Sequence, residues 1–179
     1  MSDPETNLES DASVPGRKWE DVARTAADVF SGGGDTHGTD LLRELIVFGL
    51  DGSAYAIAVE QIREIVRTRP LTRLPRSPDW LLGVMALRGE VVEVVDLRRR
   101  LGLPSAEPSR SSRIIVLHGD AERVTGILVD SVSEVYRVSE KFVRPAQGFE
   151  ATSVTEICSR GDEFISILDP DRALGFQDV

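Results

Sequence analysis

Acids, histidines and one cysteine are the residues of this chain that could do chemistry, and their spacing assembles no catalytic set. Asp96 follows an apolar run, as the phosphoacceptor of a receiver domain does, but no paired acids precede it, so capping of a following helix is favoured. His37 and His118 have no second ligand at metal spacing. Cys158 lies among aliphatic residues and is expected to be a buried structural thiol. We therefore expect neither catalysis nor a metal or cofactor.

A short basic run is the other feature that could take part in binding. Arg98, Arg99 and Arg100 follow one another directly after the candidate cap Asp96. Contact with an acidic partner is one interpretation, and a solvated helix face is the favoured one.

Composition and charge limit the classes of function. The chain has 179 residues, of which 41% are hydrophobic and 28% charged, enough for one compact unit plus a tail. No apolar run approaches the roughly 20 residues that span a bilayer, and the acidic start does not resemble a signal peptide, so we expect a cytoplasmic protein without membrane insertion. The net charge of −9 gives no general attraction to nucleic acid. A protein partner is favoured.

Residues 1–40 are expected to form an acidic, largely disordered tail. They contain nine acids against three basic residues and end in a glycine-rich linker. Within them, residues 18–30 have helical spacing and predict a short helix with an apolar stripe formed by Trp19, Val22, Ala26 and Phe30. A tethered docking helix and a transiently helical tail both remain open, and the first predicts that deleting the tail changes partner affinity.

The remainder of the chain contains an internal repeat. Residues 59–67 return as residues 129–137 with apolar, acidic and basic positions in the same order, and residues 96–103 return as residues 169–176. We therefore expect one domain over residues 41–176, made of related halves at about 42–104 and 110–176. Each half is too short for a usual domain, so the halves are expected to share an interface.

The pattern within each half predicts short strands. Four hairpins are expected around turns that contain glycine, with strands at 44–50 and 54–58, 81–87 and 91–95, 113–117 and 124–129, and 154–159 and 163–168. A single helical turn is expected before residues 65–67 and again before 135–138. Asp96 and Asp169 are expected to cap short helices that end at Gly102 and Gly175. This pattern predicts an all-β protein of two small closed or nearly closed barrels.

An ordered series of motifs resembles the CheW family of chemotaxis adaptors. The motifs cover nearly all of residues 42–176, and they are Ile62-Arg63-Glu64-Ile65, Leu71-Thr72-Arg73-Leu74-Pro75, Gly83-Val84-Met85-Ala86-Leu87-Arg88-Gly89, Val95-Asp96-Leu97-Arg98, Gly126 to Asp130 and Arg144-Pro145-Ala146. The resemblance implies two five-stranded, SH3-like barrels side by side and no catalysis. It also implies binding to the regulatory domain of the histidine kinase CheA and to the cytoplasmic tip of a methyl-accepting chemoreceptor, in membrane-associated arrays.

Two positions depart from the family pattern. Ala86 stands where the family usually has asparagine, and Glu93 stands where it usually has proline. Either change is compatible with an adaptor of pilus motility or another output, so that alternative stays open beside chemotaxis. A small-barrel enzyme and a nucleic-acid-binding barrel are less favoured classes.

The resemblance also implies where partners bind. In the family, a glutamate and an arginine at the places of Glu64 and Arg88 are close together on the receptor-binding side, whereas a solvated glutamate and an exposed turn arginine are the alternative. The repeat places Glu134 and Arg160 in the equivalent positions of the second half. Core packing is the alternative for each aliphatic member of the candidate partner contacts, which are Ile62, Glu64, Ile65, Leu74, Gly83, Val84, Arg88 and Gly89.

Overall fold

The computed structural model describes residues 41–119, 124–146 and 153–175. The helix expected over residues 18–30, with its stripe of Trp19, Val22, Ala26 and Phe30, lies outside them, as does His37. In the described part of the chain, no helix is long and apolar enough to cross a membrane.

Strands dominate the described residues, which confirms the all-β prediction. The strands are β1 (Leu42–Leu50), β2 (Ser53–Ala58), β3 (Ile62–Arg67), β4 (Leu81–Leu87), β5 (Glu90–Asp96), β6 (Arg113–Leu117), β7 (Val124–Val129), β8 (Ser131–Ser139), β9 (Val143–Pro145), β10 (Val154–Arg160) and β11 (Glu163–Leu168). The helices are short, and they are the 3-10 turns η1 (Val59–Gln61) and η2 (Glu140–Phe142) and the α-helices α2 (Leu97–Arg100) and α3 (Pro170–Leu174).

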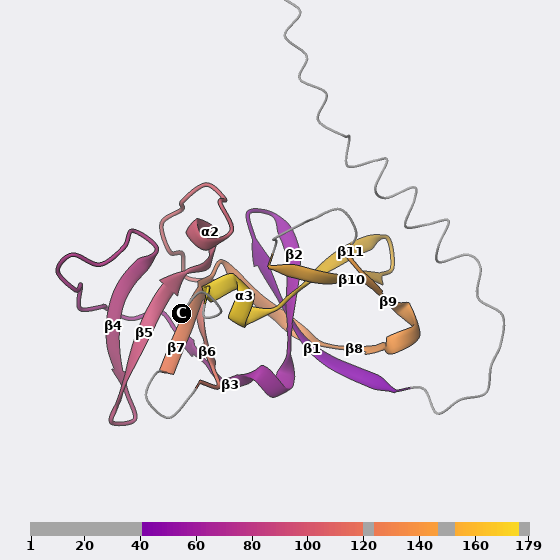
Figure 1. The fold of residues 1–179 in the computed structure, drawn as a ribbon, viewed down its shortest axis with the longest axis horizontal. Helices are drawn as coiled ribbons and strands as arrows, with labels where there is room; N and C mark the ends of the chain where they lie inside the picture. Colours follow the sequence, from indigo (N-terminus) through magenta and orange to yellow (C-terminus); the bar gives the residue numbers. More distant parts are fainter. Residues whose placement is uncertain (1–40, 120–123, 147–152, 176–179) are drawn as a thin grey trace, which may run out of the picture. The chain divides into compact units, whose positions relative to one another are not determined.

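The two sheets do not coincide with the two sequence halves. A six-stranded sheet has the order β8-β1-β2-β11-β10-β9, and a five-stranded sheet has the order β3-β6-β7-β5-β4. Figure 1 shows the exchange: the indigo hairpin β1–β2 lies between orange β8 and yellow β11, while β7 lies beside β5. Each sheet therefore combines the first hairpin of one half with the later strands of the other.

The repeat accounts for this exchange strand by strand. Replacing each strand of the first sheet by its repeat equivalent turns β8-β1-β2-β11-β10 into β3-β6-β7-β5-β4, which is the order of the second sheet. The parallel pair β2–β11 becomes the parallel pair β7–β5. The sixth strand of the first sheet, β9, also has a counterpart in the second sheet, which is the isolated bridge between Thr72 and Val84. Both sheets thus repeat one architecture, compatible with the expected pair of barrels.

Three apolar clusters follow from strands that are buried on both faces. Leu45 and Val47 of β1 pack in a cluster confined to the six-stranded sheet, while Ile46 and Phe48 pack in a central cluster that both sheets share. A third cluster, around Met85, belongs to the five-stranded sheet. A strand with two buried faces needs a continuous apolar run, which explains why β1 reads as Leu-Ile-Val-Phe without alternation.

Short turns and caps mostly form where the sequence predicts them. Asp96 accepts a hydrogen bond from the Arg99 amide at the start of α2, and Asp169 does so from Asp171 and Arg172 at the start of α3, where Gly175 ends the helix at φ 70°. One expectation was wrong. A helical turn forms before β3, but residues 131–139 continue as one strand, because the whole segment pairs with β1.

Candidate receptor-facing edge

Ion pairs join the two ends of the five-stranded sheet. Glu64 in β3 lies 3.2 Å from Arg88 in the β4–β5 turn, measured between Oε2 and Nη2. Beside it, Arg63 Nη1 lies 2.6 Å from Glu90 Oε2. Since β3 and β4 are the outermost strands in the pairing order, these contacts require the sheet to curve until its ends meet. The structure thus brings Glu64 and Arg88 together, as the resemblance implies.

A β-bulge allows two adjacent residues to reach the same hairpin. The register of β3 against β6 shifts between Ile62 and Glu64, so Arg63 is the extra residue. In a regular strand neighbouring side chains point to opposite faces, but a bulge turns one of them. Glu64 lies in β3 and not at the end of a helical turn, which corrects its expected local structure.

The backbone of Arg88 is in an uncommon conformation. Arg88 has φ 51° and Gly89 has φ 88°, and positive φ at both central residues is typical of a type I′ turn. Asn, Asp and Gly suit the first of these positions, whereas another L-residue there costs about 1–2 kcal/mol. The Arg88 side chain is 74% exposed, so its pair with Glu64 contributes only about 0–1 kcal/mol. Stability alone does not explain arginine at this turn.

Gly83 is a packing position. It is buried at φ 142°, and a Cβ there would lie 2.4 Å from the Thr72 carbonyl oxygen. Two backbone hydrogen bonds of 2.9 Å each hold Thr72 against Val84. The bare backbone of Gly83 therefore allows the loop that carries Leu74 to lie against β4.

The aliphatic candidates separate into packed and exposed residues. Ile62 packs against the shared central cluster, which supports the core interpretation for that side chain. Ile65 is 37% exposed and Leu74 38% exposed. Val91, which the sequence reasoning missed, is 66% exposed, and it pairs with Ala86 on the outer face of the β4–β5 hairpin. Strand alternation was the signal for Val91, since its neighbour Val92 is fully buried.

The second half contains the equivalent ion pair in a different setting. Arg160 Nη1 lies 2.6 Å from Glu134 Oε1, and Arg160 Nη2 lies 2.6 Å from Glu163 Oε2. The Arg160 side chain is 28% exposed, against 74% for Arg88, and its hairpin turn begins after it at Gly161. Arg160 is therefore held by two acids at a regular strand end, and Arg88 remains the more accessible of the two arginines.

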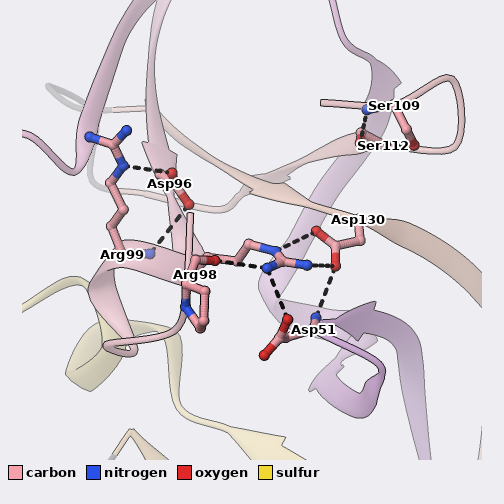
Figure 2. A network of polar contacts seen from close by, with 8 residues as sticks. Asp51, Asp96, Arg98, Arg99, Ser109, Ser112 and Asp130 are labelled. Carbon is pink, nitrogen blue, oxygen red and sulfur yellow. Dashed lines mark hydrogen bonds and ion pairs between the residues drawn. The ribbon is translucent and has the colours of Figure 1, made fainter. Parts of the chain in front are cut away.

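A second polar network ties together three separate elements (Figure 2). Arg98 of α2 donates to Asp130 through Nε at 2.8 Å and Nη2 at 2.6 Å, and its Nη1 lies 3.2 Å from Asp51 Oδ1 in the β1–β2 turn. The Asp51 amide also donates to Asp130, at 2.9 Å. The hydrogen bonds from Arg98 hold the pKa of Asp130 below its ordinary value, against the opposing effect of its partial burial.

The basic run is not one solvated helix face. The Arg98 side chain is only 12% exposed, so that interpretation was wrong for this residue. Arg99 pairs with Asp96 at 3.0 Å, as Figure 2 shows, and Arg100 lies over the Trp80 ring at 4.9 Å. All three side chains hold α2 to the body of the domain.

Cys158 is fully buried, as the sequence predicts. Burial raises the pKa of its thiol to about 11, which keeps it protonated at neutral pH. The residue is therefore a small apolar packing group and not a reactive nucleophile.

Comparisons with known proteins agree with this architecture. The family model described as CheW-like domain matches residues 44–177. Over 139 residues the chain is 34% identical to the chemotaxis protein CheW of Rhizobium meliloti, covering 75% of this chain and 89% of that protein. It is 36% identical over 103 residues to the probable chemotaxis protein CheW of Rhizobium etli, covering 58% and 66% respectively. The crystal structure of the scaffolding protein TtCheW from Thermoanaerobacter tengcongensis superposes with a TM-score of 0.67 at 28% identity, covering 72% of this chain and 90% of that one. The chain belongs to the CheW family of chemotaxis proteins.

Proposed function

We propose that this protein is a non-catalytic adaptor that couples chemoreceptors to the histidine kinase CheA. In this proposal it binds the regulatory domain of the kinase and the cytoplasmic tip of a methyl-accepting receptor, in the cytoplasm, and is recruited to membrane-associated arrays. Such a scaffold transmits a signal when the state of the receptor changes how well the adaptor holds the kinase. Family membership supports the general role.

The conformation and exposure of Arg88 carry the assignment of the receptor-facing edge. A side chain that is 74% exposed, placed in a strained turn and paired weakly, gains little for the free protein. At an interface the same guanidinium can bind a partner carboxylate by two parallel hydrogen bonds. Glu64, which is 19% exposed, would then orient Arg88. Ile65, Leu74, Val84 and Gly89 supply the surrounding contact surface.

A charge swap separates partner contact from internal pairing. Arg88→Glu should leave the fold intact and reduce receptor binding at least tenfold, because a reversed charge in an interface costs several kcal/mol. The double variant Glu64→Arg, Arg88→Glu restores the internal pair with the charges exchanged. If Arg88 contacts the receptor, this double variant stays defective.

The measurement is calorimetric titration of a receptor cytoplasmic fragment, with kinase binding followed in parallel. The matched control is Arg137→Glu, which reverses another exposed arginine, 70% exposed, on the other sheet. Full rescue of receptor binding by the swapped pair would show that Arg88 acts only by holding β3 to the hairpin. Unchanged binding in a folded Arg88→Glu variant would remove Arg88 from the interface.

The two departures from the family pattern favour a second candidate of the same class, a scaffold for pilus motility or another output. Ala86 is exposed, and Glu93 pairs with Val84 on the same face of the β4–β5 hairpin. A hairpin face altered in this way suits a divergent partner. The identity of the kinase captured from the native cytosol distinguishes the two systems.

A further inference from the structure

The arginines of the domain divide into paired and unpaired groups. Among the described residues, ion pairs engage arginines on both sheets and on both α-helices, which are Arg43, Arg63, Arg88, Arg98, Arg99, Arg137, Arg160 and Arg172. Within the same described part of the chain, no ion pair forms at Arg67, Arg69, Arg73, Arg76, Arg100, Arg110 or Arg113. Four of these seven arginines belong to one segment, residues 67–76.

Two arginines face each other at one end of the five-stranded sheet. Arg67, the last residue of β3, is the cross-strand partner of Arg113, the first residue of β6. Directly opposed side chains on paired strands have Cβ atoms about 4.5–5.5 Å apart, and like charges at this spacing destabilise a sheet. Arg113 Nη1 donates only to backbone carbonyl oxygens, at 2.9 Å to Arg110 and 2.8 Å to Ser112. No carboxylate of the described residues compensates this pair.

The local charge opposes that of the whole chain. Residues 65–80 contain four arginines and a single acid, Asp79, in a protein with net charge −9. Arg67, Arg69 and Arg110 are exposed and Arg113 is half-buried. We call these four residues the basic face. Concentrated uncompensated charge of one sign raises the local concentration of molecules of the opposite sign.

Apolar side chains adjoin the basic residues. Ile65 precedes Arg67 by two positions and is 37% exposed, and Leu74 follows Arg73 and is 38% exposed. Arginine is enriched at protein interfaces, where neighbouring apolar surface is removed from water on binding. Binding of single-stranded nucleic acid uses aromatic side chains as stacking platforms, and the one large aromatic among the exposed hydrophobic residues described, Phe142, lies on η2 and follows a strand of the other sheet. The composition of the face therefore favours an acidic protein segment over a nucleic acid.

We propose that the basic face is a docking surface for an acidic, partly apolar segment of a partner protein. Carboxylates of that segment lie between Arg67 and Arg113 and relieve their repulsion, while its apolar residues contact Ile65. This surface shares Ile65 with the contact surface around Arg88, but its four arginines are distinct from Arg88, and it adds an electrostatic contact to the adaptor without depending on which receptor or kinase the adaptor serves.

The test uses the full chain and a fluorescein-labelled synthetic peptide of glutamates with interspersed leucines. The variant Arg67→Gln, Arg113→Gln removes the opposed charges, and the control Arg137→Gln, Arg172→Gln removes two exposed, paired arginines with the same change in net charge. Anisotropy titrations at about 0.05 and about 0.3 M salt should show peptide binding that weakens with salt. We expect the basic-face variant to bind at least tenfold more weakly at low salt, and the control to bind within twofold of the wild type.

A thermal melt supplies the second measurement. The basic-face variant should melt at the same temperature as the wild type or higher, because like-charge repulsion is removed. A loss of affinity in the control equal to that in the variant would mean that overall charge, and not this face, attracts the peptide. Absence of salt-sensitive peptide binding, or tighter binding to duplex DNA or phosphatidylserine vesicles that the variant also abolishes, would overturn the proposal. None of these outcomes affects the Arg88 test, which concerns different residues and a different ligand.

Discussion

The contribution of an arginine to stability depends on how deeply its side chain is buried and on which groups it contacts. Three arginines of this domain illustrate the dependence, and they are Arg98, Arg88 and Arg67. Arg98 is 12% exposed and makes a bidentate pair with Asp130, so it links α2 to the junction of β7 and β8 and, through Asp51, to the β1–β2 turn. Arg88 is 74% exposed and weakly paired, and Arg67 faces another arginine. Only the first arrangement is expected to contribute substantially to stability, because exposed ion pairs are screened by solvent.

Loss of the Arg98 guanidinium should therefore destabilise the fold. Arg98→Ala leaves Asp130 partly buried without its bidentate donor, and we expect the free energy of unfolding to fall by about 1–3 kcal/mol. The control is Arg172→Ala, because the Arg172 side chain is 56% exposed. This substitution should lower the free energy of unfolding by less than about 0.5 kcal/mol. Urea unfolding at neutral pH measures both.

The same site predicts a pH dependence with a definite sign. The folded-state pKa of Asp130 lies below its unfolded value, so its contribution is present above about pH 4 and is lost as the pH falls through the folded pKa. Asp130→Asn should therefore be less stable than the wild type at neutral pH, and the difference should shrink in acid. An equal difference at all pH values would contradict this assignment.

At the scale of elements, the β4–β5 hairpin depends on one glycine. The bulge between Leu81 and Gly83 and the bridge from Thr72 to Val84 bring a loop against the strand. The geometry of this edge is therefore set by backbone contacts rather than by the candidate side chains themselves.

Gly83→Ala should be strongly destabilising, by about 2–3 kcal/mol, because the new Cβ would overlap the Thr72 carbonyl and the backbone stays at positive φ. Gly52→Ala is the matched control, since Gly52 also has positive φ but no heavy atom lies within 4 Å of a Cβ added there. It should cost about 1 kcal/mol. Thermal melts followed by far-UV circular dichroism measure the difference, and equal losses would show that steric overlap is unimportant at Gly83.

At the scale of the molecule, the exchange of strands makes the halves dependent on each other. A fragment of residues 41–104 would retain β1–β5 but lose β6 and β7, which connect β3 to β5 in its sheet. The complementary fragment would lose β1 and β2, which connect β8 to β11. Neither half can form a complete sheet alone.

Cutting the chain within residues 104–110 and separating the products should therefore leave two poorly folded fragments. Mixing them should restore the strand signal in circular dichroism, because the missing strands are supplied from the other fragment. The control is a chain cleaved at an inserted protease site in the same loop without separation, which should stay folded. Cooperative melting of either isolated fragment would contradict the dependence of the halves.

The sequence by itself determined the strands, the turns and the family, and tertiary structure decided how they combine. Glycine at Gly52 and Gly89, acidic caps at Asp96 and Asp169, and apolar runs such as residues 45–48 act over a few neighbours, so local pattern was sufficient to place them. The family resemblance implied that Glu64 and Arg88 lie close together, and the repeat placed Glu134 and Arg160 in the equivalent positions; the structure shows both contacts.

Other features depend on contacts between residues that are distant in sequence. Arg98 and Asp130 are 32 positions apart, Arg67 and Arg113 are 46 positions apart, and the exchange of strands joins the two halves of the chain. A repeat is equally compatible with two self-contained halves and with exchanged ones, because strands of similar pattern can satisfy either pairing. The same limit explains the failed helical turn before residues 135–138: Val129-Asp130-Ser131 has the local pattern of its counterpart, but pairing with β1 extends it as a strand. Local sequence pattern therefore determines which strands and turns form. Which strands pair with one another depends on tertiary packing, because the two faces of β1 are buried in two different clusters.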